Sequence, residues 1–500
     1  MDEPREKMSR WFQRCLLLLC VFAAPVARGH IGSPNVIYEG LAGPYHIRVI
    51  VRPPGVIPGL ADINVRVLAG EPSKVFVLPV RSDIGKSLAP APDLAKPVKG
   101  ELNLYAAQLW LMTSGAYNIV VNLEGTAGEG RTVVPVNSIA TTRLNMPKWM
   151  GGMLLAIAAA LFLALVTLVG AAVRESGLPP GEAPGRRQRI RAIVAMGVGA
   201  VVMSLALYGG RAWWNKVDAN YRNNKMYKAD PLLAAFQTNG TSTTLRVELG
   251  EAKSGRRFLV PDHGKLIHLF MVKQGDMSSF AHLHPVTMKA NRKFESVLPS
   301  LPAGRYSLYA DLTQESGFTQ TLTTDLELPN EAPPPGSLTD PDDSWLLLSA
   351  AGTMNTNVAL PGDKMMTWER AAALDDGKEM LLRFRVRGAD GKPAVLEPYL
   401  GMQGHAVLRN EDGSVFTHLH PFGTISMASQ QLFVKREQAA SPNRKSLEVV
   451  CGAPPVDDAI TFPYEFPKPG RYRIWVQVKS NAEILTGCFD AVVGQSGTKG

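Results

Sequence analysis

Histidine is scarce in this chain and is concentrated in one part of it. Of the nine histidines in 500 residues, seven lie between residues 263 and 420. The tetrapeptide His-Leu-His-Pro occurs there twice, at residues 282–285 and 418–421, and a single histidine precedes the two copies by 14 and 13 residues. Imidazole nitrogen is a preferred ligand of copper, zinc, nickel and ferrous iron. The pattern therefore indicates two candidate transition-metal sites.

The C-terminal copy is predicted to be a β-hairpin that turns at residues 410–413. With that turn, His405 lies directly opposite His418, and their Cβ atoms are about 4.5–5.5 Å apart. His420 follows His418 by two residues and so projects from the same face of its strand. Three imidazoles at this separation can hold one ion through metal–nitrogen bonds of about 2.0–2.1 Å.

The earlier copy leads to the same result. A turn at residues 273–277 places its first two histidines opposite each other, with the third on the same face. The predicted ligands, for copper or zinc, are therefore His268, His282, His284, His405, His418 and His420. A hydrogen-bonded polar cluster or a pH-sensitive patch is the alternative interpretation. His263 has no counterpart in the other copy and is predicted to be a loop residue.

The sequence around the histidines predicts a mainly β protein. Short alternating apolar runs are frequent, and the 46 glycines and 37 prolines suit a protein rich in turns. A Gly-x-Tyr tripeptide enters an alternating apolar strand three times, at residues 115–123, 304–312 and 470–478. We therefore expect three related Ig-like or cupredoxin-like β-sandwich domains, of which the second and third arise from an internal duplication.

Two apolar segments interrupt the β pattern. Residues 149–173 and 192–210 contain no charged side chain, and about 20 apolar residues suffice for a transmembrane helix. The loop between them, 174–191, contains five arginines and is predicted to be cytoplasmic by the positive-inside rule. Basic residues followed by a ten-residue apolar run at 15–24 predict a signal peptide cleaved before His30, with an uncleaved anchor as the alternative.

These features predict an inner-membrane protein of a bacterium, with most of the chain in the periplasm. The expected order is signal peptide (1–29), β-sandwich (30–145), transmembrane helix (149–173), cytoplasmic loop (174–191), transmembrane helix (192–210), tether (211–240), β-sandwich with the first His-Leu-His-Pro copy (241–328), linker (329–342) and β-sandwich with the second copy (343–494).

Only two cysteines lie outside the predicted signal peptide, Cys451 and Cys488. In an oxidising compartment they are predicted to form a disulfide, with thiolate ligation of a metal as the alternative. The net charge of +9 is small for 500 residues, and no nucleic-acid-binding motif accompanies it, so nucleic acid is not an expected partner. The expected partners are a metal ion, the lipid bilayer and other metal-handling proteins of the envelope.

The N-terminal segment resembles the YtkA-like and FixH-like families of bacterial membrane-associated β-sandwich proteins. The similarity rests on Gly43-Pro44-Tyr45, on Pro53-Pro54 with Ile57-Pro58-Gly59, and on residues 111–117. The Met-Pro-rich segment associated with YtkA-like domains is missing from this sequence. The two His-Leu-His-Pro copies are similar to segments of bacterial periplasmic proteins often found beside copper and heavy-metal handling systems, which implies a metal-handling setting.

Three functions are compatible with these features. The leading hypothesis is a membrane-anchored periplasmic metal-binding protein that serves in metal delivery, buffering or resistance, with copper as the first candidate metal. The first alternative is an envelope-anchored structural or interaction array of sandwich domains with incidental histidines. The second is a metalloenzyme with an open three-histidine site. Catalysis is less expected because the sequence has no nucleophile elbow, P-loop or dinucleotide fingerprint.

Overall fold

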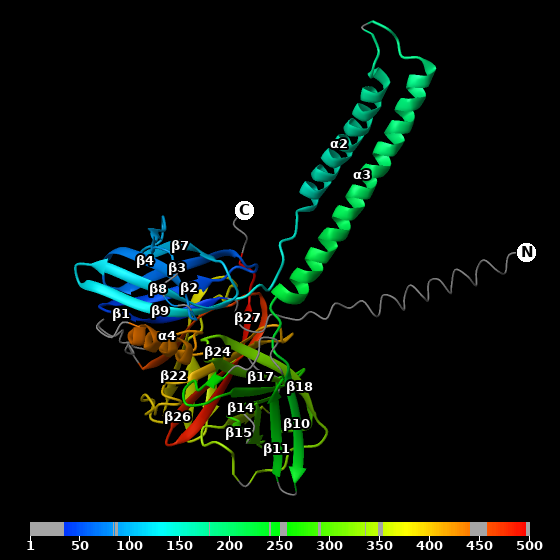
Figure 1. Ribbon diagram of the computed structural model, residues 1–500. Coiled ribbons are helices and arrows are strands. Elements are labelled where there is room, and N and C mark those ends of the chain that lie inside the picture. Colours follow the sequence, from blue (N-terminus) through cyan, green and yellow to red (C-terminus); the bar gives the residue numbers. More distant parts are fainter. Residues whose placement is uncertain are drawn as a thin grey trace, which may run out of the picture. The chain divides into compact units, whose positions relative to one another are not determined.

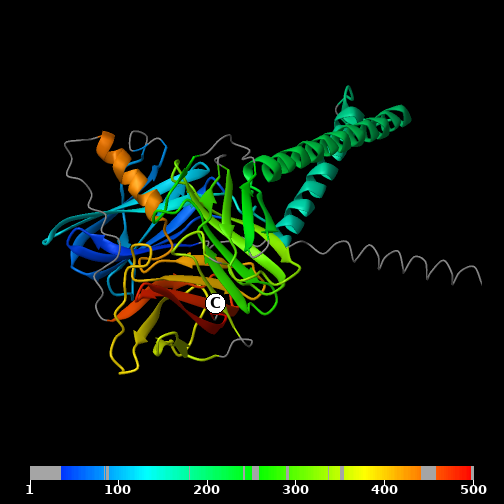
Figure 2. The ribbon, with the colours of Figure 1, turned by 90° about the horizontal axis from the view of Figure 1, so that it is seen from below.

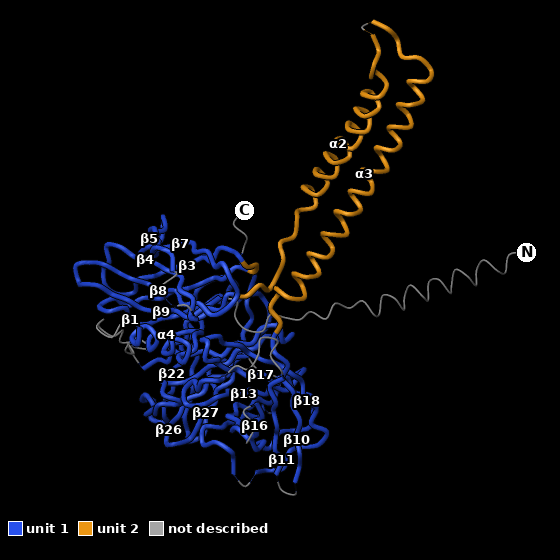
Figure 3. Tube along the Cα trace, in the orientation of Figure 1, with its two compact units in different colours: residues 1–54, 58–138, 229–500 blue, residues 55–57, 139–228 orange. Residues whose placement is uncertain are grey.

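The chain forms two compact units in the computed structural model (Figure 3). One unit is a helical hairpin of residues 139–228 together with residues 55–57, and the other contains the β domains. The predicted signal peptide lies outside the described residues, and the chain is mainly β, as predicted. The structure describes residues 35–83, 85, 89–179, 181–239, 242–250, 258–288, 292–335, 337–348, 354–440 and 458–496.

The helical unit consists of α2 (Lys148–Glu175) and α3 (Arg186–Asn220), followed by a short π-helix, η2 (Tyr221–Lys225). Their 28 and 35 residues correspond to lengths of about 42 and 53 Å, against about 30 Å for the hydrocarbon core of a bilayer. Large apolar side chains are exposed on both helices, including Leu155 (72%) and Val198 (59%). Both helices are therefore long and apolar enough to cross a membrane. They contain the two predicted spans and extend beyond them.

The first β-sandwich packs two antiparallel sheets, with strand orders β1-β2-β3-β7-β6 and β5-β4-β8-β9 (Figure 1). The alternation of strand residues explains its core, since Ala61, Ile63 and Val65 of β3 are fully buried whereas their neighbours are more exposed. The strands are β1 (Val36–Ala42), β2 (Tyr45–Arg52), β3 (Gly59–Ala69), β4 (Pro72–Arg81), β5 (Asp93–Leu94), β6 (Lys96–Pro97), β7 (Leu104–Leu111), β8 (Gly115–Gly125) and β9 (Gly128–Ser138).

The second sandwich contains the first His-Leu-His-Pro copy. Its sheets have the orders β10-β11-β16-β15 and β12-β17-β13-β14-β19, and β18 also pairs with β17. The histidine hairpin β13–β14 thus lies inside the larger sheet. The strands are β10 (Leu232–Asn239), β11 (Ser242–Leu249), β12 (Leu259–Val260), β13 (His268–Lys273), β14 (Ser279–Leu283), β15 (Val286–Thr287), β16 (Lys293–Val297), β17 (Gly304–Gln314), β18 (Thr319–Leu328) and β19 (Ser344–Leu347).

The third sandwich contains the second copy and has the sheet orders β20-β21-β22-β25 and β24-β23-β26-β27. Here too the strand that begins with a histidine, β23, pairs on both sides. The strands are β20 (Asn357–Leu360), β21 (Lys364–Trp368), β22 (Glu379–Arg387), β23 (His405–Asn410), β24 (Phe416–Leu419), β25 (Ala459–Glu465), β26 (Gly470–Ser480) and β27 (Glu483–Val493).

The segment after the second copy connects the third sandwich to the first. Backbone hydrogen bonds join Glu39 of β1 to Phe422 (2.8 Å) and Thr424 to Ile37 (2.9 Å). Helix α4 (Met427–Ala440) follows and lies against the first sandwich in both ribbon views (Figures 1 and 2), where Phe433 packs among residues of β4, β8 and β9. The residues that follow His420 are therefore fixed by hydrogen bonds to β1 and by the packing of α4 on the first sandwich.

Three of the predicted ranges differ from the structure. The predicted tether, 211–240, contains the end of α3 and the strand β10, which pairs with β11 because its alternate residues pack onto the core of the second sandwich. The predicted third sandwich, 343–494, begins too early, since β19 pairs with β14 of the second sandwich. The predicted linker, 329–342, is also partly packed, because Ala332 belongs to the second sandwich core.

Candidate metal centre

Each histidine hairpin pairs two residues away from the predicted register. Phe270, and not His268, lies opposite His282, and Val407, and not His405, lies opposite His418. The turn of the C-terminal hairpin lies one residue later than predicted, at residues 411–414, where the Asn410 amide donates to the Val415 carbonyl (3.1 Å) and the Asn410 side chain accepts from the Val415 amide (2.8 Å). A shift of two residues leaves every side chain on its original face. The predicted grouping of the histidines is therefore kept.

Both faces of these hairpins are buried. In β13, Leu269 and Met271 belong to the core of the second sandwich, whereas the alternate residues Phe270 and Val272 belong to a separate cluster. That cluster, which we call the interface cluster, joins side chains of the second and third sandwiches: Phe270, Val272, Met277, Phe280, Tyr309, Val407, Phe416 and Trp475. The histidines share the face that forms this interface, so they lie between the two sandwiches.

The two predicted triads form one continuous group. Ligand nitrogens of His268, His282 and His284 lie within 4.8 Å of one another, and the same is true of His405, His418 and His420. The His418 ring is 5.4 Å from that of His268 and 5.8 Å from that of His282 across the interface. The six histidines therefore constitute a single buried centre, which we call the histidine centre.

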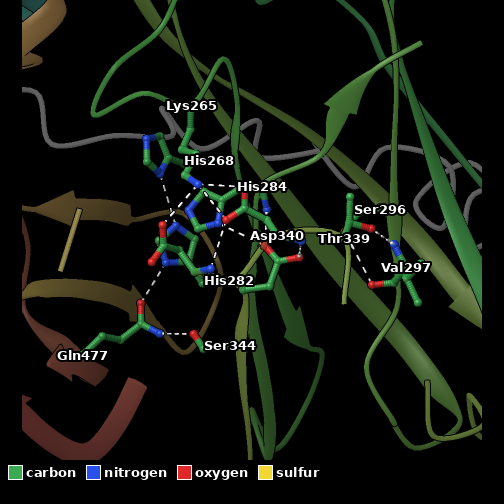
Figure 4. Close-up of polar contacts among 12 residues, drawn as sticks. Lys265, His268, His282, His284, Ser296, Val297, Thr339, Asp340, Ser344 and Gln477 are labelled. Atoms are coloured by element: carbon green, nitrogen blue, oxygen red, sulfur yellow. Dashed lines mark hydrogen bonds and ion pairs between the residues drawn. The ribbon is translucent and has the colours of Figure 1, made fainter. Parts of the chain in front are cut away.

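In the first triad, the outer nitrogens of two rings have acceptors, and Figure 4 shows the one that His282 contacts, Gln477. His268 Nε2 donates to the carbonyl oxygen of Asp262 (3.1 Å), and His282 Nδ1 donates to the side-chain oxygen of Gln477 (2.8 Å). The remaining nitrogens, His268 Nδ1 and His282 Nε2, are 3.3 Å apart. Because each neutral ring has one proton, which the outer nitrogen holds, both inner nitrogens bear lone pairs.

The second triad repeats this arrangement. His405 Nε2 donates to the carbonyl oxygen of Tyr399 (3.1 Å), and His405 Nδ1 is 3.1 Å from His418 Nε2. His418 Nδ1 lies 3.5 Å from a carboxylate oxygen of Asp311. The outer acceptors of His282 and His418 thus come from the opposite sandwich, since Gln477 belongs to β26 and Asp311 to β17.

The third histidine of each triad has one free nitrogen. His284 Nδ1 bonds with Asp343 (3.0 Å) and His420 Nδ1 donates to the carbonyl oxygen of Ile425 (3.2 Å). Their Nε2 atoms are buried and have no hydrogen-bond partner among the residues that the structure describes. A buried nitrogen without a partner is costly, so its presence in both copies needs an explanation.

Burial determines the charge of the centre. The side chains of the triad histidines are almost fully buried, and this burial lowers the pKa of His268 to about 4 and the pKa of the other five well below the usual range. Burial also raises the pKa of Asp311 and Asp343 to about 7. Near neutral pH the imidazoles are therefore uncharged, which is the state that binds a metal.

Several residues of the centre were not predicted. Asp311 and Gln477 are cross-strand partners of His268 and His405, and each is the seventh residue after the glycine of a Gly-x-Tyr strand. Superposing the two strands by that glycine would have identified this shared polar position. His263, predicted to be a loop residue, does lie in a turn, but its ring is 5.0 Å from that of His420 and so adjoins the centre.

The predicted disulfide stays a prediction. Cys451 lies outside the described residues, and Cys488 is a free thiol in the structure. Cys488 packs against the interface cluster, and burial raises its pKa to about 12. Such a thiol is almost entirely protonated at neutral pH, so in this environment it is a poor metal ligand.

A family model described as a domain of unknown function (DUF8832) matches residues 359–495, most of the third sandwich. No curated protein matches the chain. Among solved structures, a 1.5-MDa bacterial ice-binding adhesin aligns with 93% of this chain and 100% of its own at 8% identity and a TM-score of 0.15. The ICAM-5 D1–D4 ectodomain aligns with 88% of this chain and 74% of its own at 9% identity and a TM-score of 0.14. Latent PorU from Porphyromonas gingivalis aligns with 93% of this chain and 34% of its own at 8% identity and a TM-score of 0.14. TM-scores this low do not indicate a shared fold.

Proposed function

We propose that this chain is a membrane-anchored metal-binding protein that holds transition-metal ions, copper or zinc, at the histidine centre for delivery, buffering or resistance. The supporting observation is the pair of lone-pair nitrogens, His268 Nδ1 and His282 Nε2, at 3.3 Å. Two lone pairs at this distance repel each other, whereas a cation between them turns the repulsion into two coordinate bonds. Two ligands of a tetrahedral ion with bonds of about 2.0–2.1 Å are about 3.3 Å apart.

The surroundings of the imidazoles also fit a metal. Metal-ligating histidines usually donate their second N–H to a carbonyl or carboxylate, which orients the ring. The outer acceptors in both triads, listed from the first copy to the second, are the Asp262 carbonyl, Gln477, Asp343, the Tyr399 carbonyl, Asp311 and the Ile425 carbonyl. Copper is our first candidate, because divalent copper binds nitrogen ligands most tightly among the first-row divalent metals. Zinc is our second candidate.

Burial favours binding over catalysis. His282 and His405 are 0% exposed, and the other four triad histidines are nearly as buried. A substrate larger than a small ion would have to open the interface between the sandwiches to reach the ligands. Incidental histidines, as in a purely structural array, do not account for six rings with the same inward-facing arrangement in two copies.

The outer acceptor Gln477 offers a test that leaves all six ligands in place. Replacing it by leucine should weaken metal binding at His268, His282 and His284 by about 10–100-fold, because His282 Nδ1 loses its shorter hydrogen bond (2.8 Å) and keeps only the Tyr399 hydroxyl at 3.3 Å. Competition with a chromophoric chelator measures this. Gln274→Leu is the matched control, since Gln274 contacts Ser307 and Asp325 away from the centre. Equal affinity of Gln477→Leu and wild type would show that the acceptor has no such role.

We also propose that both β-rich parts of the chain face the periplasm, with the arginine-rich loop in the cytoplasm. Two helices long enough to span a membrane and five arginines between them support this arrangement. Reporter fusions at Gly181 and at Gly500 should report opposite sides of the membrane, with the second outside. The same side for both fusions would contradict the topology.

A further inference from the structure

The seventh histidine of the region, His263, belongs to neither triad. It lies in a turn of the second sandwich, at residues 262–265, where Asp262 and Lys265 exchange two backbone hydrogen bonds. Its ring is 5.0 Å from that of His420 and 5.7 Å from that of His405, both in the third sandwich. The ring of His268, in its own sandwich, is farther away at 6.2 Å. His263 therefore reaches across the interface toward the other triad.

The environment of His263 is unusual for a loop histidine. Its side chain is only 4% exposed. Its Nε2 lies 3.5 Å from a carboxylate oxygen of Asp262 but has no hydrogen-bond partner within the described part of the chain. Its φ of 51° lies in the left-handed region, which a non-glycine residue adopts at a cost. A buried polar group in a strained position is retained only where the surrounding structure compensates for it.

The turn itself does not require a histidine. The other copy forms the same turn at residues 399–402, with the same pair of backbone hydrogen bonds, and there the first turn residue is Leu400, also at φ 51°. In each turn the preceding residue, Asp262 or Tyr399, supplies a backbone carbonyl oxygen. That oxygen accepts a hydrogen bond from the first histidine of the triad in the same sandwich, His268 or His405. Leucine thus serves the backbone equally well, and the imidazole of His263 is an addition specific to one side of the centre.

Two ring separations of His263, 5.0 Å to His420 and 5.7 Å to His405, are close to those of ligands that share an ion. Among the described residues, the group whose ligand nitrogens all lie within 4.8 Å of one another contains His405, His418 and His420 but not His263. Bonds of about 2.0–2.1 Å place the ring centroids of two imidazoles on a tetrahedral ion about 5 Å apart. The centroids of His405, His418 and His420 are 4.6–5.2 Å apart. We propose that His263 is the fourth ligand of the ion held by these three, so that the second sandwich completes the metal site of the third. This inference rests on the proposed function.

A fourth ligand makes the two sites chemically different. Four nitrogens fill a tetrahedral coordination sphere, whereas the triad of His268, His282 and His284 leaves one position open. The four-nitrogen site therefore retains its ion, and the three-nitrogen site exchanges its ion or accepts an external ligand. An ion with ligands from both sandwiches also stabilises their interface, by binding only the assembled state.

The test compares two variants of the full chain in detergent, with Zn²⁺ as the probe. His263→Leu installs the residue that the other copy has in this turn, and Leu400→Ala is the matched control at the equivalent position. Chelator competition on the wild type should give two Zn²⁺ sites of unequal affinity. His263→Leu should still bind two ions, with the Kd of the tighter site raised by about 100-fold or more. The rise in Tm on adding Zn²⁺ should also shrink in His263→Leu and stay unchanged in Leu400→Ala.

The possible failures are distinguishable. Two ions bound by His263→Leu with both wild-type affinities would overturn the fourth ligand and leave the two triads standing. A loss of both ions in a folded His263→Leu variant would overturn the assignment of His263 to one site. A wild-type chain that binds no Zn²⁺ or Cu²⁺ would refute the triads and the role of His263 together.

Discussion

Simultaneous replacement of His268 and His405 by alanine should abolish stoichiometric metal binding by this chain. Each replacement removes one of the two ligand nitrogens that lie 3.1–3.3 Å apart in its triad. Loss of a residue that hydrogen-bonds to a metal ligand raises Kd by up to about 100-fold, and loss of a direct ligand should raise Kd by at least that much. Elemental analysis of the purified chain after metal loading and dialysis should find two ions in the wild type and none in the double variant.

The single variants test whether the triads act together. The sequence alone predicts two sites in separate domains, which would bind their ions independently. The structure instead places the two triads in contact and exchanges their outer acceptors, Gln477 and Asp311. We therefore expect His405→Ala to weaken binding of one ion by at least about 100-fold and to weaken binding of the other ion to a smaller extent. His46→Ala, in the first sandwich, is the control and should bind both ions; metal retained by the double variant would rule out the histidine centre.

The metal-free chain should unfold between about pH 6 and pH 4. Burial lowers the pKa of the six triad histidines and of His263, so the unfolded chain binds more protons than the folded one below the ordinary histidine pKa of about 6.5. The stability that depends on these histidines is therefore fully present above about pH 6.5. The free energy of unfolding decreases as the pH is lowered below this value, by about 1.4 kcal/mol per pH unit for each histidine that titrates.

Two buried carboxyl groups act in the opposite direction. The pKa of Asp311 and of Asp343 is raised to about 7, so their folded forms hold a proton that the unfolded forms release, and their contribution to stability grows as pH falls below 7. Because two carboxyl groups oppose seven histidines, the net effect of lowering the pH is to destabilise the folded chain. Chemical denaturation at a series of pH values measures the slope.

Two additions sharpen the pH test. Bound Zn²⁺ should move the acid midpoint to lower pH, because the ion and the proton compete for the same nitrogens. The paired variant His284→Gln and His420→Gln should reduce the slope, because both replaced histidines have a pKa that burial lowers. A free energy of unfolding that stays constant from pH 7 to pH 5 would contradict the buried neutral centre.

The histidine grouping could be predicted from the sequence because it depends on a period of two along a strand. Any hairpin register that differs by an even number of residues leaves His282 with His284, and His418 with His420, on the face of the first histidine. For this reason the wrong register did not separate the triads. The register itself depends on the position of the turn, which lies one residue later than predicted and where the Asn410 side chain bonds to the Val415 amide.

The relation between the two triads could not be predicted in this way. Both faces of each hairpin are apolar, and no local pattern distinguishes the sandwich core around Leu269 from the interface around Phe270. His263 was missed for a related reason, since its neighbours His405 and His420 are more than 140 residues away in the sequence. Strand periodicity describes one hairpin at a time, whereas the centre is made by the docking of two domains.

X-ray absorption of the copper- or zinc-loaded wild-type chain tests the central claim most directly, because it reports the atoms bound to the ion. A centre built from the six triad histidines and His263 predicts a first shell of nitrogen only, at about 2.0–2.1 Å for zinc, with the multiple-scattering pattern of imidazole rings and a histidine count of three to four per ion. A shell dominated by oxygen or sulfur, or the absence of imidazole scattering from stoichiometrically bound metal, would contradict it.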